Sequence, residues 1–157
     1  MQETVFINTE LGITKIIGDQ SGISVICIQK EGEISVNIPS ELKETVNQLQ
    51  EYFDGKRTDF TFKLNPKGTE FQQKVWRELC KIPFGKTISY LDLAKKLGDP
   101  KVIRAAASAN GKNPIWIVIP CHRVIGADGS LTGYAGGLWR KKWLLDHENP
   151  TNQQSLF

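Results

Sequence analysis

The stretch that decides how this chain folds is Ile115-Trp116-Ile117-Val118-Ile119-Pro120-Cys121-His122-Arg123-Val124. Its continuous apolar run predicts a buried strand or extended segment, and Pro120 ends the pairing because proline has no N–H to donate. Cys121 is therefore expected where a rigid buried segment stops, a place that presents a side chain to a pocket. The histidine and arginine that follow favour a thiolate, because a base or a nearby cation stabilises ionised sulfur.

A route for the thiol proton is also suggested around this cysteine. Adjacent side chains in an extended segment point opposite ways, so His122 is expected to reach the sulfur through a water molecule. The far ring nitrogen of such a histidine needs an anchor. The run Asp146-His147-Glu148, at the end of a predicted helix over residues 138–148, offers carboxylates for that purpose.

The other cysteines argue against a metal centre and a disulfide framework. Cys27 lies in an apolar strand and Cys80 near the end of an amphipathic helix, so both are expected to be inert. No Cys or His pair has the spacing of zinc ligands, so we expect no metal and no cofactor. An odd total of three cysteines, with no signal-peptide pattern and no membrane-spanning apolar run, predicts a cytoplasmic protein, which we expect to be monomeric.

Charge is distributed unevenly along the 157 residues. Residues 1–66 carry six Lys and Arg against ten Asp and Glu, whereas residues 67–157 carry fourteen against seven. A basic half of this kind favours a polyanion such as nucleic acid as its partner. A chance distribution of solvated charge is the alternative.

Residues 1–66 are expected to form a small strand-rich α/β domain. β-branched runs separated by glycines predict strands over residues 4–8, 13–17, 23–29, 34–38 and 60–62. Ser40 can cap a helix that Gly55 ends, and its apolar stripe predicts one buried face.

Residues 67–149 are expected to be helical, and residues 150–157 to form a flexible tail. Two capping-box pairs predict the starts of helices, Thr69 with Gln72 and Ser89 with Asp92. The helix at Ser89 and a third helix over residues 101–110 are short and joined by a tight turn, the outline of a helix-turn-helix. The chain is thus predicted to be an α+β protein with a winged-helix-like DNA-binding element in its second domain.

The second helix of that pair carries very small side chains, Ala105-Ala106-Ala107-Ser108-Ala109, directly after Arg104. Such a face lets a helix backbone approach a narrow DNA groove closely. It suits close helix–helix packing inside the protein equally well, and the sequence leaves both interpretations open.

From about Gly68 to Glu148 the chain resembles the O6-alkylguanine–DNA alkyltransferases. The resemblance rests on Pro120-Cys121-His122-Arg123-Val124, preceded by Asn113-Pro114 and followed by Gly133-Tyr134-Ala135-Gly136-Gly137. It extends through residues 68–76, 82–85, 89–90 and 143–148, in order and at family spacing. The first domain is similar to the family only in its strand-rich character.

The resemblance implies a repair reaction without a cofactor. A damaged base, O6-alkylguanine and by extension O4-alkylthymine, is flipped out of the duplex, and its alkyl group passes irreversibly to Cys121. The family pattern makes His122 a base that acts through water and Glu148 the acid that orients it. Asn113 would brace the active-site turn, and Tyr90 would donate to N3 of the base.

The family's DNA and base contacts map onto Arg104, Ala105, Ser108, Val124, Tyr134 and Ala135. Arg104 would fill the gap left in the base stack, with its helix against the minor groove. The carbonyls of Cys121 and Val124 would accept from the exocyclic amine of the base. Many members have serine at the position of Ala135, where the backbone N–H contacts the base oxygen, so that contact is expected to survive.

Two other functions remain beside alkyl transfer. A non-catalytic damage sensor of the alkyltransferase-like type shares the scaffold but lacks the cysteine. A cysteine hydrolase would use Cys121, His122 and Glu148 on acyl substrates, and would leave the basic half and the helix-turn-helix without a role.

The last residues, Gln153-Gln154-Ser155-Leu156-Phe157, resemble the short peptide with which bacterial repair proteins bind the sliding clamp. In such a peptide Gln153 fixes the orientation, while Leu156 and Phe157 fill an apolar pocket. A tail that packs on its own domain is the alternative. The expected partners are therefore double-stranded DNA with alkylated bases and, through the tail, the bacterial sliding clamp.

Overall fold

The computed structural model describes residues 1–150, which form two compact units. One comprises residues 1–67 with 114–116, and the other comprises residues 68–113 with 117–150. The short segment 114–116, which the sequence analysis placed in the second domain, is therefore part of the first unit. No helix within residues 1–150 is long and apolar enough to cross a membrane.

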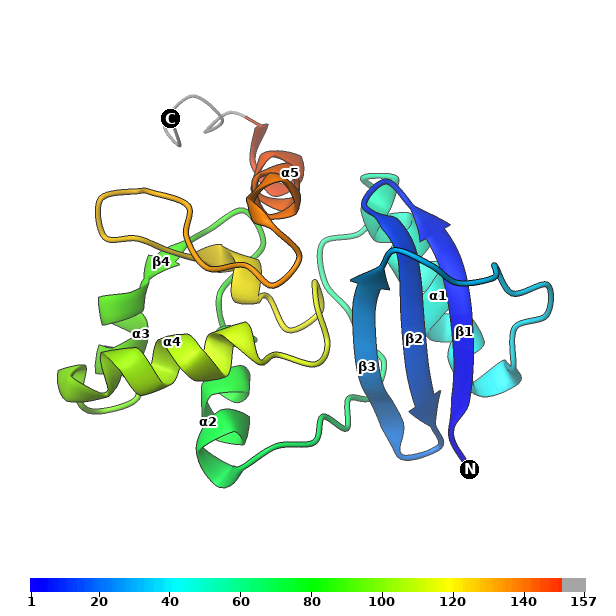
Figure 1. Cartoon of the computed structure of the whole chain (residues 1–157), viewed down its shortest axis with the longest axis horizontal. Helices are drawn as coiled ribbons and strands as arrows, with labels where there is room; N and C mark the ends of the chain where they lie inside the picture. The colour runs from blue at the N-terminus through cyan, green and yellow to red at the C-terminus, as the bar shows by residue number, and fades with distance from the viewer. Residues whose placement is uncertain (151–157) are drawn as a thin grey trace. The chain divides into compact units, whose positions relative to one another are not determined.

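A three-stranded antiparallel sheet with a helix behind it makes up most of the first unit (Figure 1). In the order β1-β2-β3, its strands are β1 (Glu3–Thr9), β2 (Gly12–Asp19) and β3 (Gly22–Gln29). Val5, Ile16 and Ile26 lie opposite one another across the three strands and are buried. Helix α1 (Ser40–Phe53) contacts β1 and β2, and its predicted apolar stripe, Leu42, Val46 and Leu49, is buried.

Two expectations for the segment that leads into α1 are wrong. Residues 34–38 form no strand, because they meet β1 at Phe6, which accepts from the Ser35 N–H at 2.9 Å and donates to the Ser35 hydroxyl at 3.0 Å. Contact with one residue does not make a ladder. Ser40 does not cap α1 with its side chain, since Pro39 occupies the cap position and Ser40 is the first helical residue.

The outer edge of β3 is paired at both ends with segments from elsewhere in the chain. The strand predicted over residues 60–62 does not form. Instead, Leu64 makes a parallel bridge to Ile23. At the other end the backbone of Ile26 donates to Pro114 at 2.9 Å and accepts from Trp116 at 2.8 Å. Because unpaired edges promote association, these two short pairings protect the sheet.

Capping decides where the helices of the second unit begin. Both predicted capping boxes are confirmed: Thr69 accepts from the Gln72 N–H at 3.1 Å, and Ser89 from the Asp92 N–H at 3.0 Å. They start α2 (Glu70–Leu79) and α3 (Tyr90–Lys96). The indole of Trp76 then links α2 to α4 (Ile103–Gly111) by a 2.9 Å hydrogen bond to the Ala109 carbonyl.

The helix-turn-helix consists of α3 and α4. The helix predicted over 101–110 is preceded by a 3-10 turn, η1 (Pro100–Val102), whose cap is Asp99. Before α3, the short strand β4 (Ile88–Ser89) pairs in parallel with β5 (Val124–Ile125). This pairing joins the start of α3 to the segment just after Cys121, so it positions the candidate site.

The last described helix, α5 (Leu138–Glu148), buries a stripe with an unusual composition. Its buried residues are Lys141, Leu144, Leu145 and Glu148. The spacing is that of one helical face. This face therefore carries a cation at one end and a carboxylate at the other, both inside the unit.

Candidate active site

Cys121 begins a single 3-10 turn, η2 (Cys121–Arg123), and is 5% exposed. The run before it is buried at its three isoleucines, whereas Trp116 and Val118 are half-buried, and it is not a strand beyond the bridge at Ile115. Residues 116–118 turn, and Ile117 has a φ of +75°. A β-branched residue in the left-handed region costs about 1–3 kcal/mol, so its surroundings must hold it there.

Asn113 supplies part of that support. Its Nδ2 donates to the Ile119 carbonyl at 2.7 Å, across the strained turn, and the side chain is 4% exposed. The same side chain is hydrogen-bonded to the Cys121 thiol and lowers its pKa. One amide thus links the shape of the turn to the sulfur.

The carboxylate of Glu148 is bonded by two neighbouring residues of η2. His122 Nε2 lies 2.8 Å from one carboxylate oxygen, and Arg123 donates through Nε at 2.7 Å and Nη2 at 3.0 Å. Burial alone would raise the pKa of Glu148, but His122 and Arg123 outweigh it and hold that pKa well below its usual range. Glu148 is therefore a buried anion, and among the carboxylates of residues 146–148 it is the one bonded to His122.

The thiol itself is neutral in the free protein. Burial raises the pKa of Cys121 to about 11, while the Asn113 hydrogen bond and the charge of Lys141 lower it only in part. A pKa near 11 leaves about one molecule in ten thousand as thiolate at neutral pH. Burial therefore outweighs the neighbours that favour the thiolate, so the proton must be removed during the reaction.

The cation beside Cys121 is Lys141, not Arg123. The guanidinium of Arg123 is engaged by Glu148 and by the Ile82 carbonyl, 2.7 Å from Nη1. Lys141 is fully buried, and its charge favours the thiolate. Burial lowers the pKa of Lys141 to about 8, and the Cys121 sulfur opposes that shift.

Lys141 also connects the groups that the family resemblance assigns to base binding. Its Nζ donates to the carbonyls of Val124 at 2.7 Å and Thr132 at 2.6 Å, and lies 5.7 Å from the centre of the Tyr90 ring. The Tyr90 hydroxyl donates to the same Thr132 carbonyl at 3.1 Å. Burial raises the pKa of Tyr90, so its hydroxyl keeps the proton it would donate.

The small-residue helix presents two different faces. Arg104, Ala105 and Ser108 are exposed on α4, whereas Ala106 and Ala109 are buried. Helix packing inside the unit therefore accounts for the buried side, and the groove interpretation concerns the exposed side alone. Tyr134, half-buried, and Ala135, exposed, lie in the loop before α5.

Other candidate positions are less informative. Gln153, Leu156 and Phe157 lie outside the described residues. Within residues 1–150, no group of three or more His, Cys, Asp or Glu is arranged to hold a metal ion.

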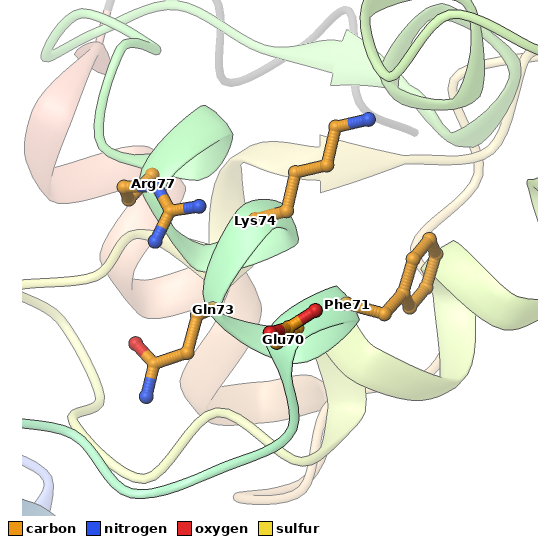
Figure 2. Close-up of a pocket in the computed structure, with 5 residues that line it drawn as sticks. All are labelled: Glu70, Phe71, Gln73, Lys74 and Arg77. Atoms are coloured by element: carbon orange, nitrogen blue, oxygen red, sulfur yellow. The ribbon is translucent and has the colours of Figure 1, made fainter.

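An open hollow of about 560 Å³ lies against α2 and is lined by Glu70, Phe71, Gln73, Lys74 and Arg77. Figure 2 shows these five side chains leaving the helix. The hollow contains no nucleophile and none of the predicted site residues.

Sequence reasoning missed Lys141 and the role of Arg123 as a partner of Glu148. A lysine is normally exposed, which hid Lys141 among the charged residues of α5. A usable signal existed, because Lys141 precedes Leu144, Leu145 and Glu148 by three, four and seven residues, the period of one helix face.

Together, a helix-turn-helix and a buried cysteine next to a histidine–glutamate pair define a nucleic-acid-binding protein with a cysteine nucleophile. Residues 70–150 match the family described as "6-O-methylguanine DNA methyltransferase, DNA binding domain", and residues 4–66 match the ribonuclease-like domain of the same family. The chain belongs to the 6-O-methylguanine DNA methyltransferase family.

Individual relatives agree over both units. The methylated-DNA–protein-cysteine methyltransferase of Methanosarcina mazei is 46% identical over 140 residues, which cover 85% of this chain and 88% of the relative. The crystal structure of Mycobacterium tuberculosis O6-methylguanine methyltransferase superposes with a TM-score of 0.86 at 39% identity, covering 96% and 94% of the two chains. Mycobacterium tuberculosis OGT in complex with DNA gives 0.84 at 40% identity, covering 97% of each chain.

The neutral resting thiol gives a testable pH dependence. Since the pKa of Cys121 is raised to about 11, its reaction with iodoacetamide should rise about tenfold per pH unit from pH 6 to 9.5, without a plateau. Free cysteine, whose pKa is near 8.5, should level off within that range. Peptide mapping by mass spectrometry follows Cys121 separately from the other cysteines, and circular dichroism checks the fold. A plateau below pH 8.5 would contradict the burial argument.

Proposed function

We propose that this protein repairs DNA by taking an alkyl group from O6-alkylguanine onto Cys121, once per molecule. The observation that carries the proposal is the buried Cys121 thiol beside the His122–Glu148 pair, in a unit that also contains an exposed helix-turn-helix face. The relatives support it, because they are named as methyltransferases that act from methylated DNA to a protein cysteine. O4-alkylthymine is proposed as a further substrate.

The chemistry follows from the bonding of these residues. His122 takes the thiol proton through a water molecule, and Glu148 stabilises the imidazolium that results. The thiolate attacks the alkyl carbon, a C–S bond forms, and the C–O bond breaks with its electron pair going to guanine. Tyr90 leaves the Thr132 carbonyl to donate to N3 of the departing base, while Lys141 continues to bond that carbonyl.

Several contacts would hold the flipped base in place. The carbonyls of Cys121 and Val124 accept from its exocyclic amine, and the Ala135 N–H donates to its oxygen. Tyr134 lines the same loop. Asn113 keeps the turn that carries the sulfur in its strained shape.

The exposed face of α4 is proposed to meet the minor groove. Arg104 extends from it and fills the space that the flipped base leaves, while Ala105 and Ser108 allow close approach. The excess of basic residues over residues 67–157 supports the contact with phosphate.

A finer proposal concerns the tail. Gln153, Leu156 and Phe157 match the pattern of a clamp-binding peptide, and we propose that they bind a bacterial sliding clamp. Such a contact would keep a cytoplasmic, monomeric repair protein near newly replicated DNA.

Transfer of label from DNA tests the main proposal. A duplex that contains O6-[methyl-³H]methylguanine should transfer one equivalent of label to the protein, and Cys121→Ser should abolish the transfer. Cys80→Ser is the matched control and should transfer normally. Binding without transfer would instead indicate a damage sensor, and repeated turnover of an ester would indicate a hydrolase.

Arg104→Ala tests the DNA-facing role of α4. The variant should react with free O6-alkylguanine at the normal rate but lose about tenfold or more in rate on duplex DNA, because stabilising an unstacked step is worth a few kcal/mol. Arg104→Lys keeps the charge and should recover the duplex rate only in part. Lys43→Ala, an exposed cation of α1, is the control. Equal loss on free base and duplex would rule out this role.

Deletion of Leu156-Phe157 tests the tail. Affinity for a purified bacterial sliding clamp, measured by surface plasmon resonance, should fall at least about tenfold because both apolar anchors are lost. Gln154 is not one of the three residues expected to contact the clamp, so Gln154→Ala is the control and should bind normally. Unchanged affinity after the deletion would dispose of the clamp proposal.

A further inference from the structure

Asn110 is a buried polar residue beside Cys121 that the chemistry above does not use. It lies in the last turns of α4, is 2% exposed, and its Nδ2 donates to the Cys121 carbonyl at a long 3.4 Å. Its Oδ1 is buried and has no hydrogen-bond partner among the protein atoms of residues 1–150. A buried acceptor without a donor costs about 1–3 kcal/mol, so this atom calls for an explanation.

The orientation of this amide is fixed by its neighbour. A carbonyl oxygen only accepts hydrogen bonds, so the nitrogen of Asn110, not its oxygen, must face the Cys121 carbonyl. The two amide atoms share one carbon, which keeps Oδ1 within a few ångströms of the Cys121 backbone. An acceptor is thereby held next to the residue that carries the sulfur.

A second unpartnered acceptor lies on His122, the residue that follows Cys121. His122 is fully buried, and its Nε2 faces the ionised Glu148 carboxylate, which can only accept, so Nε2 carries the ring hydrogen. Its Nδ1 is then a bare acceptor, buried and without a protein partner among the described residues. Thus two buried acceptors lie close to the Cys121 backbone, one on Asn110, which donates to its carbonyl, and one on His122, the next residue along the chain.

One water molecule has the hydrogen-bonding capacity that this arrangement needs. It can donate one hydrogen to each acceptor and accept a third hydrogen bond from the thiol. Buried waters in proteins typically make about three such bonds to otherwise unpaired polar groups. With His122 as its single acceptor, the same water would be free to turn its lone pair away from the sulfur.

We propose that Asn110 is a positioning residue whose Oδ1 holds the water that carries the proton from Cys121 to His122. This inference rests on the proposed alkyl transfer. It adds a residue that the family resemblance does not assign to the reaction. The thiol proton passes to the water, and the water passes a proton to His122 Nδ1. The products are a thiolate and an imidazolium paired with Glu148, so charge and protons balance.

Single-turnover kinetics test the role of Asn110. Asn110→Leu keeps the approximate size but removes the acceptor. Its transfer rate at saturating alkylated duplex should fall about 10-fold to 100-fold, with the half-saturating DNA concentration unchanged. The rate should also recover toward wild type as the pH is raised, because a growing fraction of the Cys121 thiol is then already ionised and the water-held relay matters less. A rate within twofold of wild type, or a loss confined to DNA affinity, would overturn the proposal.

A double-mutant cycle separates positioning from loss of packing. Asn110→Leu and Glu148→Gln act on the same proton path, so the combined variant should be scarcely slower than the slower single variant. If the two losses in transfer rate multiply in the combined variant, Asn110 acts outside the proton path. Gln48→Leu, a buried amide of α1 1% exposed, is the matched control; it should lower thermal stability without slowing transfer.

A smaller pair of variants covers the case in which leucine does not fold. Asn110→Ala and Asn110→Ser differ by one hydroxyl, and the serine variant should transfer faster because it can still bind the water. Equal rates would count against the proposal. Wild-type protein separates the two levels of inference: if it gains no alkyl group at Cys121, the proposed function fails, whereas normal transfer by all Asn110 variants refutes the water site alone.

Discussion

The buried carboxylate of Glu148 is the group on which the rest of the site depends. It is bonded by His122 and Arg123, and Arg123 also donates to the Ile82 carbonyl. One anion at the end of α5 therefore fixes the turn that carries the sulfur and the loop after α2. Removing one partner of such a buried ion pair typically costs 3–5 kcal/mol, so this charge is structural as well as chemical. Arg123 and His122 share the carboxylate, so Glu148 orients the histidine while part of its negative charge is balanced by the guanidinium.

A neutral resting thiol suits a protein that is consumed by its reaction. An exposed thiolate would react with any electrophile, and each such event would end the life of one molecule. Burial keeps the Cys121 proton in place, while Asn113 and Lys141 lower the cost of removing it. Burial thus protects the sulfur, while these two side chains keep its ionisation within reach of a reaction.

Features set by neighbouring residues could be predicted from the sequence, and those set by distant contacts could not. The capping boxes at Thr69 and Ser89 follow from side chains three residues apart, so they were predictable. The turn at Ile117 was not, because a β-branched apolar run favours a strand and only the surrounding structure forces the positive φ. The burial of Lys141 likewise depends on the carbonyls of Val124 and Thr132, which no local pattern reveals. The His122–Glu148 pairing is an intermediate case. The family resemblance predicted the pair, but only the structure gives the distance between the two side chains.

The pairing of Ile26 with Pro114 and Trp116 ties the loop that precedes Cys121 to the sheet of the first unit. The chain leaves the second unit after Asn113, completes a sheet edge, and returns at the strained Ile117, four residues before the sulfur. A fragment lacking residues 1–67 would keep every candidate catalytic side chain, yet it would release one anchor of that loop. The positive φ of Ile117 would then depend more heavily on the hydrogen bond from Asn113 to the Ile119 carbonyl. The strand-rich unit thus anchors one end of the loop that leads to the nucleophile.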